Sequence, residues 1–328
     1  MEKKYELTGE TKNVGDSVLY RIKALRSFGS VNEGDLGGFV ESETNLSHEG
    51  TCWIFGDAMV YENAKVYGNA VIREDAKVFG DAEVHGNADV QGSVVIGGNA
   101  NIYENAKVYA FAEVDENANV FGDAEVRGNT HVHGDACVYG KARVRGDACV
   151  YGKARVFGNA DIYGDACVYG KAHVFGNACV YGHARMHGAA AACDFAHVHG
   201  YANMFGDSIV FGHAEVCEST SVYDNAKIYE NAYVHGDAKI CCSANICGDA
   251  DVKKSSDYAM YKNTWSSYRY FTWTRSNNMW KVGCFHGTGE ELVAKAYKDS
   301  KLSGDCYKAI VDMRNLLTTY ENDANHSR

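Results

Sequence analysis

The chain has 328 residues and a formal net charge of −11 at pH 7, and it contains 35 glycines but no proline. No apolar run approaches the roughly 20 residues that a membrane-spanning helix needs, so we expect no membrane association. The first residues lack an apolar h-region, and the 12 cysteines come without a secretory signal, so we expect free thiols and a cytoplasmic location.

Residues 1–53 are expected to form a β-rich lead-in and a cap. Ser17–Ile22 has the composition of a strand, and a glycine-rich turn follows it. Val40 and Leu46 lie six residues apart, but in a register that differs from that of the repeat after them. We interpret residues 31–53 as a capping turn, because an open solenoid end would leave unpaired strand edges.

A strict period of six organises residues 54–252. Every sixth residue in this range, here called a slot, is Val or Ile except Met186, Ala192 and Met204. The residue four places after each slot is Ala except at Val94, Thr130, Ser208 and Thr220. A fixed short period is typical of a solenoid, in which each unit is buried by stacking on its neighbours. The Gly-Asn and Gly-Asp pairs between the slots are expected at corners, since these residues tolerate positive φ.

The unit Val-x-Gly-[Asp/Asn]-Ala resembles the hexapeptide repeat of left-handed parallel β-helices. In that family three hexads make one triangular coil, and the aliphatic side chain fills each wall from inside. The resemblance implies an all-β fold, a left-handed parallel β-helix solenoid of about eleven coils.

A second resemblance covers nearly the whole chain. The block Gly34–Glu43 and the following Asn45–Ile54 resemble uncharacterised hexapeptide-repeat proteins of bacteria and tailed phages, some labelled transferase-like or polymer-forming. The stretches Phe271–Arg275 and Gly283–Thr288 resemble tails attached to phage members. This resemblance implies the cytoplasm of a bacterial host cell, and it implies a fold far more strongly than an activity.

Stacking at 18-residue steps assigns the outward residues to columns, and one column consists mostly of aromatic rings. One interpretation is cross-strand stacking that stabilises the coils. The other is an exposed aromatic patch that marks a protein interface. The candidate partner contacts in this column are Tyr103, Phe121, Tyr139, Phe157 and Phe175.

One segment, residues 188–195, departs from the motif. Ala192 replaces the usual Val, and Asp194-Phe195 replaces a corner Gly-Asn pair. We expect a locally irregular coil from which Phe195 protrudes as a further candidate contact.

Charge is spread unevenly along the chain. Residues 54–252 carry a net charge of −12, whereas residues 1–53 carry −3 and residues 253–328 carry +4. The acidic solenoid makes direct nucleic-acid binding unlikely along its length. Asp147 and Asp165 are instead candidate contacts for a basic groove on a host enzyme.

The change of charge sign supports a domain boundary at residue 253. Residues 268–285 show the alternation and central turn of a β-hairpin. Thr288 to Glu291 is a capping box that opens one helix, and a second helix is expected from Gly304 to about Tyr320. Residues 253–328 are therefore expected to form a small α+β module of ββαα type.

The candidate contacts of this module are Trp273, Arg275 and Trp280. Two interpretations stay open. The rings form the core of a module that covers the last coil, or they form a basic aromatic surface that contacts a partner.

We predict no enzyme activity and no cofactor. Hexapeptide acyltransferases resemble this chain in their hexads, but they commonly carry an extruded loop with a catalytic His, and this repeat passes without insertion. We also predict no bound metal. His131, Cys149 and Cys167 share a column, but a straight column is poor tetrahedral geometry for zinc.

The sequence therefore predicts a rigid, non-catalytic binding or scaffold protein that acts through protein–protein contacts. The partner is either a host enzyme or a second subunit, which makes a homo-oligomer the expected state. The finer hypothesis is a phage-encoded inhibitor of a host defence or nucleic-acid enzyme that uses its acidic surfaces. The alternative is a hexapeptide-repeat acyltransferase that uses acyl-CoA.

Overall fold

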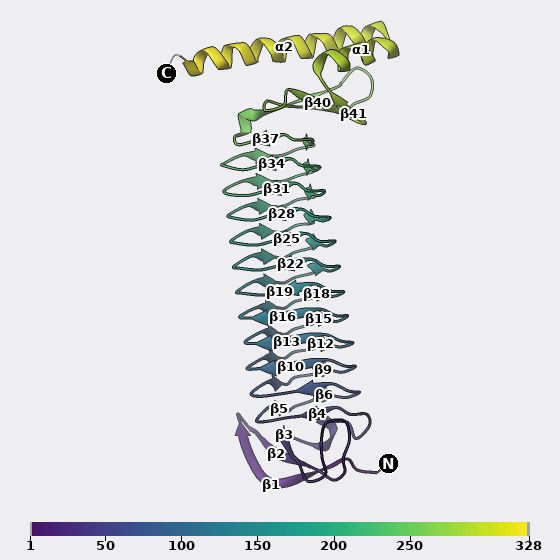
Figure 1. Ribbon diagram of the computed structural model, residues 1–328, viewed down its shortest axis with the longest axis vertical. Coiled ribbons are helices and arrows are strands. Elements are labelled where there is room, and N and C mark those ends of the chain that lie inside the picture. The colour runs from purple at the N-terminus through teal and green to yellow at the C-terminus, as the bar shows by residue number, and fades with distance from the viewer. Residues whose placement is uncertain (1, 327–328) are drawn as a thin grey trace.

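The computed structural model describes residues 2–326, most of which form a parallel β-solenoid (Figure 1). Strands β4 (Trp53–Ile54) to β37 (Asp251–Val252) fall one to each hexad. Each consists of the slot residue and the residue before it, and three strands run on for two further residues: β10 (Asp89–Gly92), β13 (Lys107–Ala110) and β16 (Glu125–Gly128). The structure thus confirms the hexapeptide-repeat solenoid.

Every third strand pairs in parallel, so the solenoid has three walls. The first wall runs from β6 (Lys65–Val66) to β36 (Asn245–Ile246), the second from β3 to β35 (Lys239–Ile240), and the third from β4 to β37. Pairing keeps an 18-residue offset, as between Val150 and Val168. The third wall has 12 strands, one for each coil, so there are twelve coils, slightly more than predicted.

The first coil begins earlier than expected. β1 (Tyr5–Val14) and β2 (Ser17–Ala24) form an antiparallel hairpin, and β3 (Leu36–Val40) pairs both with β2 and, in parallel, with β5 (Met59–Val60). The segment from β3 through the short helix η1 (Glu43–Asn45) to β4 is therefore a solenoid coil, and the interpretation of residues 31–53 as a capping turn is wrong.

The shifted register of this first coil has a simple origin. Val40 pairs with Val60 and Leu46 bridges to Val66, which are offsets of 20, whereas Ile54 pairs with Ile72 at the usual 18. The coil thus contains two extra residues between Leu46 and Ile54. The antiparallel hairpin of β1 and β2, and not the coil, forms the N-terminal cap.

The core of the solenoid is made of the slot residues and the small residues, with exposed fractions of 0–1%. The coil at Ala192 is regular. Strand β27 (Ala191–Ala192) pairs in register with β24 (His173–Val174) and β30 (Ile209–Val210). The expected irregularity is wrong, because the backbone ladder does not depend on the size of the slot side chain. Met186 and Met204, both fully buried, bring longer and adaptable side chains into this part of the core.

The corners adopt the left-handed backbone conformation that the Gly-Asn and Gly-Asp pairs predict. Gly140, for example, has a φ of +73°. At some corners a Glu takes this position, and its carboxylate then accepts the backbone N–H of the corner in the next coil. Distances from the amide nitrogen to the carboxylate are 2.8 Å from Gly80 to Glu62, 2.8 Å from Gly236 to Glu218 and 2.6 Å from Gly248 to Glu230.

Residues after the solenoid fold into the expected α+β module, with two strands more than predicted. An antiparallel sheet contains, in order, β38 (Tyr258–Lys262), β39 (Tyr270–Thr274), β40 (Met279–Val282) and β41 (Phe285–Gly287). Helices α1 (Gly289–Asp299) and α2 (Lys301–His326) follow and lie across the end of the solenoid (Figure 1). Among the described residues no helix is long and apolar enough to cross a membrane.

This module closes the last coil with three side-chain hydroxyls, one for each wall. The backbone N–H groups of the last strands donate to Oγ of Ser255, Oγ1 of Thr272 and Oγ of Ser276. The donors are Lys239 on the second wall at 3.0 Å, Asn245 on the first at 3.0 Å and Asp251 on the third at 2.7 Å. These bonds replace carbonyls that a further coil would supply, so one N–H group on the last strand of each wall keeps an acceptor.

Candidate functional site

The aromatic column of the first wall is a continuous stack of rings. From Tyr67 to Phe175, successive ring centroids lie 4.5–5.2 Å apart, and the ring planes differ by at most 6°. The five candidate contacts, Tyr103, Phe121, Tyr139, Phe157 and Phe175, are all half-buried in it. Stacking between coils is therefore confirmed as their structural role. Their contact with a partner stays a prediction, and only ring edges are available for it.

A second regularity was missed in the sequence. Outward side chains pair diagonally with the residue 16 places later, on the next coil. The hydrogen-bonded atoms lie 2.8–3.0 Å apart in the pairs Tyr67–Glu83, Arg145–Asp161, His199–Glu215 and His235–Asp251. Burial, reinforced by the hydrogen bond to Glu83, raises the pKa of Tyr67 to about 12. The signal was present in the sequence as polar partners at a spacing of 16.

The two candidate corner acids already have partners within the chain. Asp147 accepts a hydrogen bond from Nδ2 of Asn129 at 3.2 Å. Asp165 lies 3.0 Å from Nδ1 of His183, and both side chains are about half exposed, at 52% and 51%. These acids therefore contribute to ladders along the corner as well as to the surface charge.

The candidate contacts of the C-terminal module serve its core. Trp273 and Trp280 are each 1% exposed, which leaves no ring face for a partner. Arg275 forms ion pairs with Asp257 and Glu321 and lies over the Trp273 ring. The hypothesis that these residues form a contact surface is wrong for the two tryptophans, because the sheet and helices enclose them. By contrast, Phe195 protrudes as expected, at 50% exposure, and stacks on His213.

An exposed apolar stripe on α2 was also missed. Its members recur at alternating steps of four and three residues: Leu302, Cys306, Ala309, Met313, Leu316 and Tyr320, with Leu317 beside them. Leu316 and Tyr320 are 58% and 65% exposed. The opposite face of the helix packs on the sheet through the buried Val311 and Arg314, and the Arg314 guanidinium lies over the Trp273 ring. The spacing was readable in the sequence, but which face would be covered was not.

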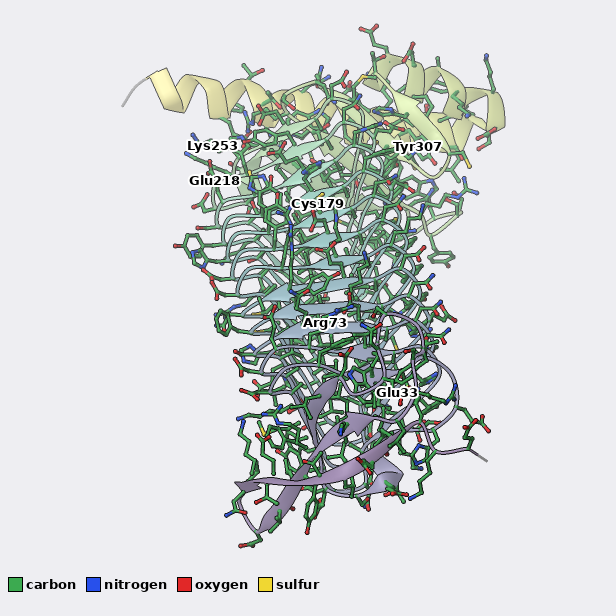
Figure 2. The ribbon with its side chains drawn as sticks, turned by 60° about the horizontal axis from the view of Figure 1, so that its bottom comes forward. Glu33, Arg73, Cys179, Glu218, Lys253 and Tyr307 are labelled. Carbon is green, nitrogen blue, oxygen red and sulfur yellow. The ribbon has the colours of Figure 1, made fainter. Side chains whose placement is uncertain are left out.

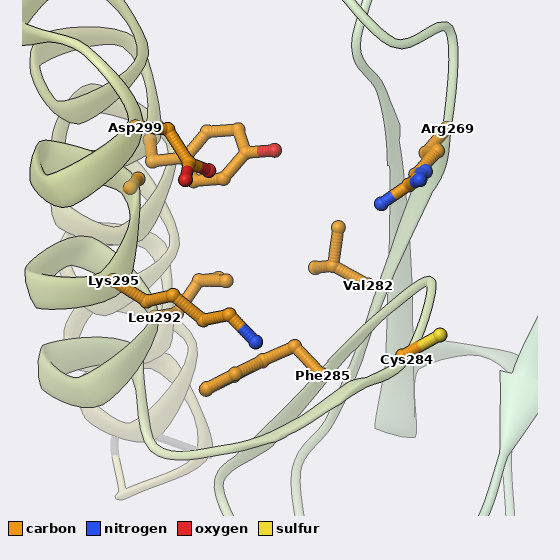
Figure 3. Close-up of a pocket in the computed structure, with 9 residues that line it drawn as sticks. Arg269, Val282, Cys284, Phe285, Leu292, Lys295 and Asp299 are labelled. Atoms are coloured by element: carbon orange, nitrogen blue, oxygen red, sulfur yellow. The ribbon is translucent and has the colours of Figure 1, made fainter.

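The cavity between α1 and the β40–β41 hairpin is too small for a cofactor (Figure 3). It holds about 80 Å³ over an apolar floor that includes Val282 and Leu292, whereas ligand pockets usually hold about 300–1,000 Å³. Lys295 and Arg269 approach it from opposite sides, with Asp299 at its rim (Figure 3). This arrangement suits a few waters or a small ion.

A shallow groove of about 380 Å³ on the second wall is lined by side chains that are better suited to acid–base chemistry. It is lined by Tyr169, His183, Arg185, His187, Tyr201 and Asn203. Because Asp165 engages Nδ1 of His183, the other ring nitrogen can serve as a general base, and Arg185 supplies a positive charge nearby. The groove is open, and outward side chains project from the coils along the length of the solenoid (Figure 2).

Three groups of potential metal ligands occur within the described part of the chain. In each group the donor atoms lie within 4.8 Å of one another: His199, Glu215 and Cys217; Asp224, Cys241 and Cys242; Glu230, Cys247 and His286. The column of His131, Cys149 and Cys167 is not among them, and His131 instead lies 3.0 Å from the Glu113 carboxylate.

Comparison with known proteins gives one partial likeness to an enzyme. No model of a known protein family matches the chain. A stretch of 69 residues, 19% of the chain, is 36% identical to a protein named uncharacterized acetyltransferase YdcK from Escherichia coli (strain K12). The match spans only 20% of that relative, about one fifth of its length.

Proposed function

We propose that the chain is a rigid scaffold that assembles with a second copy of itself through the apolar stripe of α2. The observation that carries this proposal is the exposure of that stripe on the face opposite Val311 and Arg314. Its alternating spacing of four and three residues is that of a coiled-coil seam. A contiguous apolar surface of this kind on a water-soluble chain usually marks an interaction site.

A second copy is the occupant that this stripe fits best. Two identical helices place the same spacing face to face, which gives a closed, two-fold contact. Charge does not oppose it, since the stripe itself is uncharged and the neighbouring Lys308 and Asp312 pair within their own helix. Figure 1 shows α2 lying across the solenoid end and extending past its edge, where a second helix can reach it.

The expected affinity of this contact is modest. Each helix offers five large apolar side chains that are 42–65% exposed: Leu302, Met313, Leu316, Leu317 and Tyr320. Covering about half of such a side chain contributes about 1 kcal/mol, so the ten in a dimer contribute on the order of 10 kcal/mol before the cost of association. With an association cost of at least about 4 kcal/mol, at most about 6 kcal/mol remains, so we expect a dissociation constant of tens of micromolar or weaker.

Sedimentation equilibrium of the full chain, from about 10 μM to about 1 mM, tests this proposal. We expect a reversible dimer that Met313→Glu together with Leu316→Glu abolishes, with the circular dichroism spectrum unchanged. The matched control is Phe111→Glu, because Phe111 is 67% exposed but lies on a solenoid corner. A wild-type chain that is monomeric throughout, or a dimer that survives the double substitution, would count against the proposal.

Inhibition of a host enzyme is the other form that a binding function can take. Its support is the net charge of −12 over residues 54–252. It is the weaker proposal, because Asp147 and Asp165 already engage neighbours within the chain. Exchange of both for Lys tests it, since a host partner captured on the wild-type chain should then be lost while the dimer persists.

An acyltransferase is the second candidate, favoured by the partial likeness to the acetyltransferase YdcK and by the Asp165–His183 pair in the second-wall groove. In this role His183 would take the proton from an acceptor hydroxyl or amine. The test is titration calorimetry with acetyl-CoA, followed by an acyl-transfer assay of His183→Ala against His213→Ala. Heat of binding at millimolar acetyl-CoA, together with acyl transfer that His183→Ala removes and His213→Ala keeps, would support an enzyme, and the absence of binding heat would reject one.

A further inference from the structure

His199, Glu215 and Cys217 meet on the third wall in two consecutive coils. His199 directly follows β28 (His197–Val198), and Cys217 directly follows β31 (Glu215–Val216), so the two occupy one column, 18 residues apart. Glu215 is the outward residue of β31 and reaches diagonally to His199. Its Oε1 lies 2.9 Å from Nε2 of His199, and Sγ of Cys217 completes a triangle whose donor atoms all lie within 4.8 Å of one another.

The three side chains are held in place by their neighbours. The His199 ring stacks on Tyr181, with centroids 4.5 Å apart and planes within 4°. Cys217 is 3% exposed, and its thiol lies 3.5 Å from the hydroxyl of Tyr233, whose ring stacks on His235 at 4.4 Å. Ligands oriented in advance by a surrounding layer of contacts are typical of metal sites that bind tightly.

The electrostatic surroundings favour a cation. The carboxylates of Glu215 and Glu218 both act on the buried sulfur of Cys217, and a carboxylate oxygen of Glu215 lies within 4.8 Å of it. The group at Cys247 differs, because a cationic side chain, that of Lys281, acts on its sulfur in addition to the Glu230 carboxylate.

We propose that His199, Glu215 and Cys217 form a binding site for one divalent transition metal of the zinc class. Imidazole nitrogen, carboxylate oxygen and thiolate sulfur are the ligands that zinc accepts together, and calcium or magnesium would prefer oxygen alone. Three protein ligands leave a fourth tetrahedral position, which faces the outside of the wall and can take a water molecule or a partner's side chain. On binding, the Cys217 thiol loses its proton to solvent and the thiolate bonds to the metal.

The diagonal pair alone does not make this site. His235 and Asp251 repeat the same geometry at 2.9 Å, yet the residue 18 places after His235 in the same column is Lys253 and not a cysteine. His131→Ala is a suitable control, because it removes another imidazole that pairs with a carboxylate, that of Glu113 at 3.0 Å, and His131 lies on a different wall from the three ligands.

Metal titration of the full chain tests the proposal. After treatment with a chelator, zinc is added in competition with a chromogenic chelator, and cobalt is added as a spectroscopic probe of thiolate ligation. We expect one equivalent of bound zinc and a cobalt–thiolate absorption band. Cys217→Ser should remove the band, and His199→Ala should lower the affinity at least about tenfold.

The controls separate this site from the other two groups. Cys247→Ser and Cys241→Ser, one in each of the other groups, and His131→Ala should leave both the stoichiometry and the cobalt band unchanged. Failure of the wild-type chain to bind zinc at micromolar concentration would overturn the proposal, as would full binding by Cys217→Ser. Loss of the band in Cys247→Ser alone would likewise overturn it, because the ion would then lie at the solenoid end.

Discussion

Asp161 is a carboxylate that the third wall leaves only 6% exposed, and its bonds to Arg145 decide whether that burial is tolerated. Nε and Nη2 of Arg145 donate to its two oxygens at 3.0 and 2.8 Å, and Arg143 adds an ion pair at 3.5 Å. The Arg145 guanidinium also lies 4.4 Å from the centroid of the Tyr163 ring. A buried charge that loses its partner destabilises a fold far more than an exposed one does.

Arg145→Met is therefore expected to lower the free energy of unfolding by about 2 kcal/mol, below the usual range because Arg145 is partly exposed and Arg143 remains. The control is Arg73→Met, since the Arg73–Asp89 pair has both side chains more than a third exposed and should cost less than about 1 kcal/mol. Adding Asp161→Val to Arg145→Met should restore most of the loss. Urea unfolding measures all three, and equal losses in the two single variants would contradict the argument.

At the scale of elements, the last strand of each wall keeps an acceptor for one backbone N–H group, because a side-chain hydroxyl takes the place of the carbonyl of a further coil. Thr272 is 1% exposed and accepts the Asn245 N–H at 3.0 Å, so Thr272→Val removes the acceptor while it keeps the shape. We expect a loss of about 1–3 kcal/mol, as for a buried donor left unsatisfied.

Hydrogen exchange checks this prediction directly. The amide of Asn245 should exchange faster in Thr272→Val, while amides in the middle coils keep their protection. Thr319→Val is the control, because its hydroxyl donates only to a carbonyl of its own helix, that of Asn315. Unchanged exchange at Asn245 would show that the hydroxyl does not close the edge.

The same contrast between middle and ends explains what the sequence could predict. A slot such as Val150 repeats, so its burial and its pairing with Val168 follow from the period and from the resemblance to a hexapeptide repeat. The first coil was not recognised as a coil from the sequence, because its two extra residues shift the six-residue pattern without abolishing it. Strand β38 was not predicted, because it lies outside the repeat and no periodic pattern indicates it.

The candidate site was harder to predict, because it depends on which face of an element is covered. Trp273 and Leu316 are both large and apolar, yet one is buried by the sheet and helices and the other is exposed on α2. Composition alone cannot separate them. The diagonal pairs and the His199 cluster are different, since they follow from fixed spacings of 16 and 18 once the coil length is known.

At the scale of the whole molecule, each coil contacts only its two neighbours, so a coil should be removable as a unit. Deletion of residues 145–162 removes 18 residues, joins Val144 to Tyr163 and lets β19 (Arg143–Val144) pair with the next strand of the third wall, β25 (Cys179–Val180). The variant should keep its circular dichroism spectrum, melt within a few degrees of the wild type and be shorter by about 4.8 Å. Deletion of residues 145–153 removes half a coil and places slots out of phase with corners, so that variant should not fold. If both deletions unfold the chain alike, its stability does not reside in contacts between neighbouring coils.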